Sequence, residues 1–238
     1  MDDWNYRPAA DQQLKPGDSM KSVRREAGLI GATTQFGWRV LTRLYLLTYH
    51  RLEVHGLEYV PDSPPFVLVA NHASHLDALV LAAALPWHLR RSAFPIAAGD
   101  TFFETKATTV FAAMMLNALP MWRKRCGSHG MAELRSRLVE EPAIYLLFPE
   151  GTRSRTGEIG SFKPGLGMLL GGADVPVVPC HLKGAFEALR PGARWPKPEK
   201  LVLRMGAPLR FNSLPNDKTG WRAIAEQLEQ SVRHLAKS

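Results

Sequence analysis

The chain has 238 residues, of which 45% are hydrophobic and 22% are charged, a composition typical of a folded soluble or peripheral protein with one sizeable core. Its formal net charge of +8 favours an anionic partner, such as an acidic membrane surface or an acidic carrier protein. Nucleic acid is not expected, because the basic residues are dispersed and no nucleic-acid-binding motif occurs. No uncharged apolar stretch reaches about 18 residues, so a membrane-spanning helix is not expected either.

The first fifty residues divide into a polar tail and an apolar segment. Residues 1–20 carry Pro, Gly and Asp, and we expect them to be disordered. Residues 21–50 predict an amphipathic helix. Its apolar stripe, with the residues that widen it, consists of Phe36, Val40, Leu44, Leu47, Trp38, Leu41 and Tyr45. Its narrow polar stripe consists of Gln35, Arg39, Arg43 and His50. This pattern predicts a helix lying on an anionic membrane, although a helix packed on the protein's own core has the same pattern.

Beyond residue 50, short apolar runs alternate with helical patterns. Strands are expected at 51–55, 66–70, 93–98, 143–147, 175–179 and 201–205. Helices are expected at 78–85, 108–119, 128–138 and 221–235, with a short one opening at 162–165. The alternation predicts one α/β domain over residues 51–238, a layered fold with a largely parallel central sheet flanked by helices. The amphipathic helical segment precedes this domain.

The segment from Asn71 to Asp77 links the predicted strand at 66–70 to the helix that follows it. His72 lies on a strand-to-helix turn, and Asp77 lies five residues later in the first helical turn. Side chains five residues apart on one regular helix point away from each other, but the turn lets Asp77 reach back to the imidazole. A carboxylate that holds one ring nitrogen leaves the other as a proton acceptor.

Three interpretations of this turn are open on these residues alone. The first is structural, with Asp77 capping the helix or complementing its dipole. The second is a metal site formed by His72, His75 and Asp77, although two residues separate the histidines and the pattern of known His/Asp metal hydrolases is not matched. The third is catalysis with His72 as the general base.

A second motif favours catalysis. Phe148-Pro149-Glu150-Gly151-Thr152-Arg153 follows the predicted strand at 143–147. The ordered pair of motifs resembles the glycerolipid acyltransferase family, best known for its 1-acylglycerol-3-phosphate acyltransferases, over roughly residues 50 to 210. The resemblance implies transfer of a fatty acyl group from a thioester, acyl-CoA or acyl-carrier protein, to a lysolipid hydroxyl. The most fitting acceptor is 1-acylglycerol-3-phosphate, which would give phosphatidic acid.

The resemblance also assigns roles to residues. His72, oriented by Asp77, is expected to be the general base. Arg153 is expected to bind the acceptor's phosphate, because its planar fork pairs with phosphate oxygens. Glu150 either accepts a bond from an acceptor hydroxyl or holds Arg153 in place. Gly151 permits the tight turn, and backbone N–H groups near it are expected to stabilise the oxyanion.

The remaining polar residues of the two motifs have smaller expected roles. Thr152 is expected to cap or hydrogen-bond locally, and Ser74 to cap the helix, because direct transfer needs no covalent acyl-enzyme. Arg123 matches a position where the family commonly has an arginine, and it is the expected second phosphate contact. Lys163 and Arg155 are equally open as phosphate contacts or surface cations. No metal and no cofactor are expected.

One departure bears on the acceptor. Many family members carry a lysine after the strand that follows the first motif helix, whereas residues 97–103 here contain none and Lys106 comes only later. A lysophospholipid-remodelling enzyme, or another lipid O-acyltransferase with a different head group, is therefore an alternative. From other classes, a metal-dependent hydrolase and a non-catalytic lipid-binding module are alternatives. The expected location is peripheral, on the cytoplasmic face of a membrane.

Overall fold

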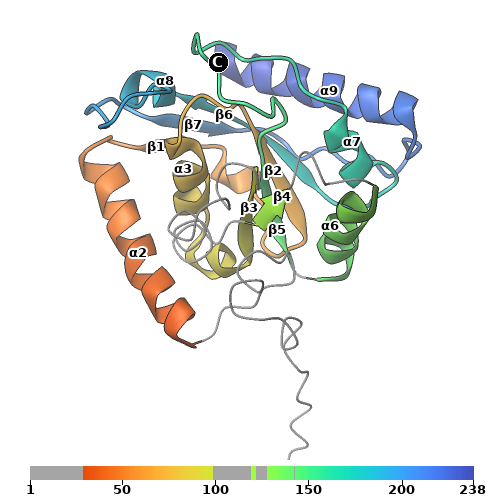
Figure 1. The fold of residues 1–238 in the computed structure, drawn as a ribbon, viewed down its shortest axis with the longest axis horizontal. Helices are drawn as coiled ribbons and strands as arrows, with labels where there is room; N and C mark the ends of the chain where they lie inside the picture. Colours follow the sequence, from red (N-terminus) through yellow and green to blue (C-terminus); the bar gives the residue numbers. More distant parts are fainter. Residues whose placement is uncertain (1–28, 99–118, 122–127, 142) are drawn as a thin grey trace, which may run out of the picture.

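The computed structural model describes residues 29–98, 119–121, 128–141 and 143–238 (Figure 1). At its centre lies a seven-stranded sheet in the order β1-β7-β6-β2-β5-β3-β4. The strands are β1 (Glu53–His55), β2 (Phe66–Ala70), β3 (Ala93–Ala98), β4 (Leu119–Met121), β5 (Ile144–Leu147), β6 (Val177–Lys183) and β7 (Val202–Met205). All neighbouring strands are parallel except β6 and β7, which confirms the predicted largely parallel sheet.

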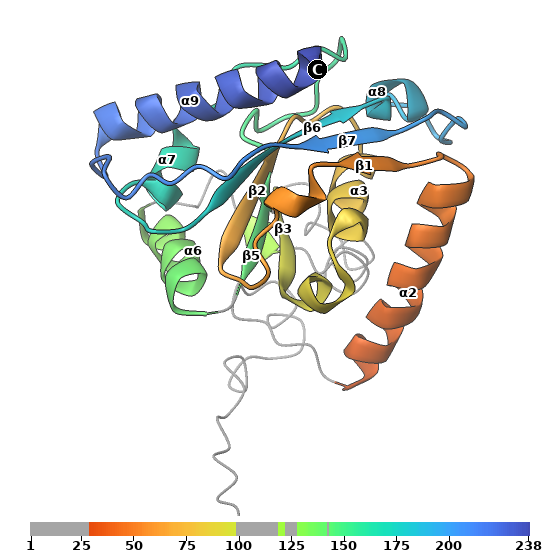
Figure 2. The same ribbon diagram turned by 180° about the vertical axis from the view of Figure 1, so that it is seen from behind.

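Helices cover both faces of this sheet (Figures 1 and 2). They are α2 (Leu29–Thr48), α3 (Leu76–Ala84), α6 (Ser128–Glu140), α7 (Gly165–Leu170), α8 (Ala185–Ala188) and α9 (Lys218–Lys237), with 3₁₀ turns η1 (Leu57–Tyr59) and η2 (Trp87–Ser92). Strand β2 is buried throughout and shows why there are two cores. Phe66, Leu68 and Ala70 pack with α3, whereas Val67 and Val69 pack with α6, α7 and α9, because successive side chains of a strand point to opposite faces.

Helix α9 confirms the closing helix expected at 221–235 and packs one apolar face inward. Ile224, Ala225, Leu228 and Val232 are buried against the sheet. The helix begins where the carboxylate of Asp217 accepts hydrogen bonds from the backbone N–H groups of Thr219 and Gly220. An N-terminal cap of this kind satisfies donors that the first helical turn leaves without partners.

Two predicted boundaries are wrong. The strand expected at 175–179 begins at Val177 and runs on to Lys183, so Pro179 lies inside β6 instead of ending it. Leu119, expected to end a helix, lies in β4, where Leu119–Met121 pairs with Ile96–Ala98 of β3; residues 108–118 of that expected helix lie outside the described residues. Parallel pairing at the sheet edge overrides the local helical pattern, and Pro120 is tolerated because an edge strand has one unpaired side.

Helix α2 lies within the predicted 21–50 segment, and most of its predicted apolar stripe faces away from the rest of the protein. Its outward side chains are Phe36, Val40, Leu41, Leu44 and Leu47, each between 37% and 63% exposed. Leu46 is fully buried in the core shared with α3. Among the described helices, none combines the length and apolarity that crossing a membrane requires.

Two residues of the predicted polar stripe, Arg43 and His50, make polar contacts with the protein. The guanidinium of Arg43 donates to the carbonyl oxygen of Ala83 at the end of α3, with 2.8 Å between Nη1 and O. His50 is not part of the helix, which ends at Thr48, and its buried ring contacts the Tyr45 hydroxyl. The helix is therefore held partly by polar contacts, and its apolar stripe is left exposed.

Candidate active site

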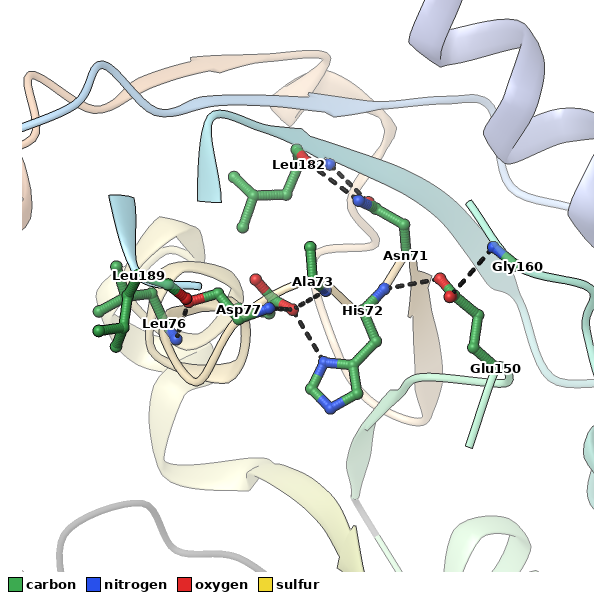
Figure 3. Close-up of polar contacts among 10 residues, drawn as sticks. Asn71, His72, Ala73, Leu76, Asp77, Glu150, Gly160, Leu182 and Leu189 are labelled. Carbon is green, nitrogen blue, oxygen red and sulfur yellow. Dashed lines mark hydrogen bonds and ion pairs between the residues drawn. The ribbon is translucent and has the colours of Figure 1, made fainter. Parts of the chain in front are cut away.

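The first motif begins where β2 ends. The side-chain amide of Asn71 donates from Nδ2 to the carbonyl oxygen of Leu182 at 3.0 Å, and its Oδ1 accepts from the Leu182 N–H at 2.8 Å (Figure 3). These two bonds continue the ladder between β2 and β6 for one more step after the strand backbone turns away. Asn71 thus fixes the point at which the turn that carries His72 leaves the sheet, a role that the sequence did not indicate.

His72 and Asp77 meet across the turn as predicted. Nδ1 of His72 lies 2.8 Å from Oδ2 of Asp77 (Figure 3). The same Oδ2 accepts from the backbone N–H groups of Ala73 at 2.7 Å and Ser74 at 2.9 Å. Because the carboxylate can only accept, Nδ1 is the donor and the neutral ring carries its lone pair on Nε2.

The two partners differ in their access to solvent. The side chain of Asp77 is 1% exposed, and that of His72 is 23% exposed. Phe148 stacks on the His72 ring, with 4.4 Å between ring centroids and 23° between the ring planes. The imidazole is therefore fixed by a buried carboxylate and an aromatic face, and the rest of the ring remains accessible to a substrate.

The second motif is hydrogen-bonded to the backbone of His72. Oε1 of Glu150 accepts from the His72 N–H at 2.8 Å (Figure 3). The Ser154 N–H donates to the His72 carbonyl oxygen at 2.7 Å. Oε2 of Glu150 accepts from the Gly160 N–H at 3.1 Å. Both peptide groups that flank the His72 Cα are thus held by a loop almost eighty residues further along the chain.

Glu150 consequently supports the turn. The carboxylate is 7% exposed, and burial raises its pKa, although the hydrogen bonds from His72 and Gly160 oppose that effect. Within the described residues, no hydrogen bond or ion pair joins Glu150 to Arg153. Of the two roles expected for Glu150, holding Arg153 is therefore not what this structure shows.

Gly151 adopts the left-handed conformation that the tight turn requires, with φ at +73°. Its N–H donates to the carbonyl oxygen of Phe148 at 3.0 Å, so this N–H is bonded within the turn. A Cβ added at Gly151 would lie 2.7 Å from Nζ of Lys163. The ammonium group of Lys163 therefore lies directly beside the motif loop, where the sequence left its role open.

Arg153 lies near the histidines of the first motif. The pKa of His75 is lowered by burial first and then by the positive charges of Arg153 and His72. The Arg153 side chain is half-buried, whereas Thr152 beside it is exposed. The site thus brings together His72, Asp77, Glu150, Gly151, Thr152 and Arg153, while Arg123 lies outside the described residues.

Ser74 lies one residue before His75, which occupies the N-cap position of α3. Its hydroxyl accepts from the Leu76 N–H at 3.2 Å at the start of α3 and donates to the carbonyl oxygen of Leu189 at 3.0 Å. The metal interpretation of the turn finds no three-residue cluster of His, Cys, Asp or Glu across the described ranges. Oδ2 of Asp77 accepts three hydrogen bonds within the turn.

The amino-acid sequence of the chain is similar to those of known proteins. A family model described as Acyltransferase matches residues 51–183, more than half of the chain. The 1-acyl-sn-glycerol-3-phosphate acyltransferase alpha of Ovis aries is 35% identical over 131 residues, which are 54% of this chain and 44% of the sheep protein. The chloroplastic 1-acyl-sn-glycerol-3-phosphate acyltransferase BAT2 of Brassica napus is 30% identical over 156 residues, 61% of this chain and 41% of that protein.

The similarity to the curated relatives covers only part of their length. The chain spans less than half of the length of these two curated relatives. The crystal structure of the 1-acyl-sn-glycerophosphate acyltransferase of Thermotoga maritima matches with a TM-score of 0.61 and 21% identity, covering 88% of this chain and 89% of that one, and it supports the fold. Since the family model covers both motifs and most of the sheet, the chain belongs to the acyltransferase family.

Proposed function

We propose that the protein transfers a fatty acyl group from a thioester to the hydroxyl of a lysolipid, with 1-acylglycerol-3-phosphate as the acceptor and phosphatidic acid as the product. The observation that carries the proposal is the contact between His72 Nδ1 and the buried Oδ2 of Asp77, in a turn that the second motif holds in place. The names of the curated relatives support the acceptor class. The donor is acyl-CoA or acyl-carrier protein, and neither metal nor cofactor takes part.

In the proposed mechanism, His72 acts as the general base. Its Nε2 takes the proton of the acceptor hydroxyl as the oxygen attacks the thioester carbonyl carbon, and the new C–O bond forms. Asp77 stabilises the imidazolium that results. The tetrahedral intermediate then expels the thiolate as the C–S bond breaks, and the proton on Nε2 passes to the departing sulfur.

The acceptor's phosphate is proposed to bind at the second motif. Arg153 and Lys163 both lie at this loop, and together they supply a planar fork and a point charge close to His72. Arg123 remains a proposed second arginine contact. A phosphate bound at this loop would lie a few atoms from the reacting hydroxyl in a 1-acylglycerol-3-phosphate acceptor, which supports the proposed acceptor.

The enzyme is further proposed to work as a peripheral protein on the cytoplasmic face of an anionic membrane. The exposed apolar face of α2 supports this, because soluble proteins rarely present so many large apolar side chains along one helix. Its acceptor is a lipid that lies at the bilayer surface. The helix would then lie in the headgroup region with Arg43 still bonded to α3.

A thiol-release assay with a panel of acceptors tests the function. The purified full chain is given acyl-CoA or acyl-carrier protein together with 1-acylglycerol-3-phosphate, lysophosphatidylcholine or lysophosphatidylethanolamine, and products are identified by mass. Release that depends on 1-acylglycerol-3-phosphate and yields phosphatidic acid is expected. Preference for another head group would assign a remodelling activity. Loss of activity with a chelator, together with stoichiometric bound metal, would instead favour the hydrolase.

A further inference from the structure

A basic, aromatic loop lies at the rim of the catalytic turn. Residues 189–197, here called the Trp195 loop, follow α8 and form most of the connection to β7. The side chain of Trp195 is 74% exposed, more than any other large hydrophobic residue that the structure describes. The guanidinium of Arg194 lies 5.9 Å from the centre of the Trp195 ring. An indole exposed to this extent gains nothing from the fold of its own chain.

The loop is positively charged and contains two prolines. Arg190, Arg194 and Lys197 lie within it, and it contains no acidic residue. Pro191 and Pro196 fix two backbone φ angles, which lowers the entropy that the loop would lose on binding. A cationic loop with an exposed indole is favourable at the interface of an anionic bilayer, where tryptophan and basic side chains are both stable.

The Trp195 loop continues the surface of α2. The Tyr49 hydroxyl, just beyond the end of that helix, donates to the carbonyl oxygen of Pro196 at 3.1 Å. The Leu201 N–H donates to the His50 carbonyl oxygen at 3.0 Å. In both views the loop beside α8 lies next to the carboxyl-terminal end of α2 (Figures 1 and 2). Leu47, in the last turn of α2, is also exposed, so the apolar face reaches the loop.

The loop is also bonded to the catalytic turn. Its first residue, Leu189, accepts the hydrogen bond from the Ser74 hydroxyl, two residues from His72 (Figure 3). Its last residue, Lys197, donates its N–H to the Ala188 carbonyl oxygen at 2.7 Å, which closes the loop on α8. The loop that carries Trp195 is therefore hydrogen-bonded, through its first residue, to the turn that carries His72.

We propose that the Trp195 loop is a second membrane contact, which inserts Trp195 into the headgroup region of an anionic bilayer beside the apolar face of α2. This inference rests on the proposed function. A single helix on a surface leaves the body free to rotate about the helix axis, whereas two separate contacts fix one orientation. The second contact lies at the catalytic turn, so the site opens towards the layer in which a lysolipid acceptor lies.

An acidic carrier protein is the competing partner for the loop's charges. The continuity with α2 and the exposed indole favour the bilayer, because a carrier protein would be held by the basic side chains without needing either. The two partners are separated by experiment.

The position of residue 195 relative to the bilayer is measured directly. Trp195→Cys is made in a Cys126→Ser background and labelled with an environment-sensitive fluorophore; Cys180 is buried. The matched control is Val139→Cys, since Val139 is 53% exposed on α6, across the sheet from α2. With phosphatidylglycerol vesicles, we expect a blue shift and quenching by brominated lipid at position 195 and neither at 139. Protein that sediments with vesicles while the label at 195 is unchanged would overturn the proposal.

The second part of the experiment measures vesicle binding and activity in variants of the loop. Arg190→Gln with Arg194→Gln is expected to lower the vesicle partition coefficient by about fivefold per charge removed. Trp195→Ser is expected to lower kcat/KM for acceptor presented in vesicles and to leave it unchanged for detergent-dispersed acceptor, while Val139→Ser changes neither. If the arginine variant instead raises only the KM for an acyl-carrier-protein donor, the loop binds that protein and the proposal is wrong. Failure of the wild type to transfer acyl groups in detergent would count against the proposed function, and the fluorescence result still decides the loop.

Discussion

Single residues in this site divide into those placed to react and those that hold them in position. Asp77 combines both tasks, because one carboxylate oxygen binds the His72 ring and two backbone N–H groups of the same turn. The histidine alone has an accessible ring. Its substitution removes the proposed base and the ring's bond to Asp77, but keeps the backbone hydrogen bonds of the turn to Asp77, Glu150 and Ser154.

His72→Ala is expected to reduce acyl transfer by roughly 100- to 10,000-fold, the usual contribution of general-base assistance. The melting temperature should stay close to that of the wild type, since the backbone of residue 72 keeps its bonds to Glu150 and Ser154. Initial rates of thiol release measure the effect. His75→Ala serves as the control and should be mild; an equal loss in that variant would contradict the His72–Asp77 assignment.

Glu150→Gln tests positioning against substrate binding. Both oxygens of Glu150 accept bonds from N–H groups, so one of these donors would face the amide nitrogen of glutamine instead. We expect a loss of about 1–3 kcal/mol in the free energy of unfolding, the cost of an unsatisfied buried group. Denaturant titration measures it, and kcat should fall while the acceptor KM changes little. A variant of normal stability with a raised acceptor KM would instead place Glu150 in contact with substrate.

Arg153→Ala should raise the acceptor KM and leave the donor KM nearly unchanged. A charge-assisted phosphate contact contributes about 1.5–3 kcal/mol, which corresponds to a rise of roughly 10- to 150-fold. Arg153→Lys should recover only part of the loss, because a point charge cannot replace a bidentate fork. Steady-state kinetics with varied acceptor measure both variants. An acceptor KM equal to that of the wild type would remove Arg153 from the phosphate site.

At the scale of elements, α2 is bound to the body by its polar and buried side chains while its apolar stripe remains exposed. Phe36→Ser with Leu44→Ser should therefore abolish sedimentation with anionic liposomes and preserve activity on detergent-dispersed acceptor. Thermal stability should be unchanged, because both side chains are about half exposed. Full liposome binding by this variant would show that α2 is not the anchor.

Deletion of residues 1–50 is a poorer test of whether α2 anchors the protein to a membrane. It would remove Leu46, which is fully buried against α3, and the ring of His50, which packs between Tyr45 and the backbone of Glu199. Removing a buried leucine alone costs about 2–5 kcal/mol. The deleted protein is therefore expected to be unstable for reasons unrelated to membranes.

At the scale of the whole molecule, acid stability depends on a histidine within the sheet. His181 lies on β6 opposite Arg204 of β7, and its Nδ1 is buried without a hydrogen-bond partner in the described part of the chain. Burial, and then the charges of Arg204 and Lys183, lower its pKa to about 4 from the ordinary 6.5. The unfolded chain therefore binds a proton in a pH range where the folded chain does not.

The sign of the effect follows from this difference. The contribution of neutral His181 to the free energy of unfolding is fully present above pH 6.5. It is lost as the pH drops towards 4, by up to about 3 kcal/mol. His181→Gln should flatten the free energy of unfolding between these pH values, as measured by urea titration. His55→Gln, which changes an exposed histidine of β1, should leave the slope as it is. An unaltered pH dependence in His181→Gln would exclude His181 as its source.

Local patterns in the sequence determined those elements whose conformation depends on residues close together in the chain. The buried run at β2, the apolar face of α9 and the spacing of His72 and Asp77 follow from periodicity and turn chemistry over a few residues. The order of the two motifs was enough to indicate the family. These features were predictable because each depends on contacts near in sequence, or on a pattern that only one secondary structure can bury.

Tertiary structure decided what depends on distant partners. Strand β6 continues past Pro179 because Asn71 and β7 supply partners more than twenty residues away. Glu150 supports the catalytic turn because two separate N–H groups converge on its carboxylate. The period of an amphipathic helix shows that it has two faces but not which of them meets the body. In α2 that choice came from the buried fit of Leu46 and from the bond between Arg43 and the end of α3, which leave the apolar stripe facing outward.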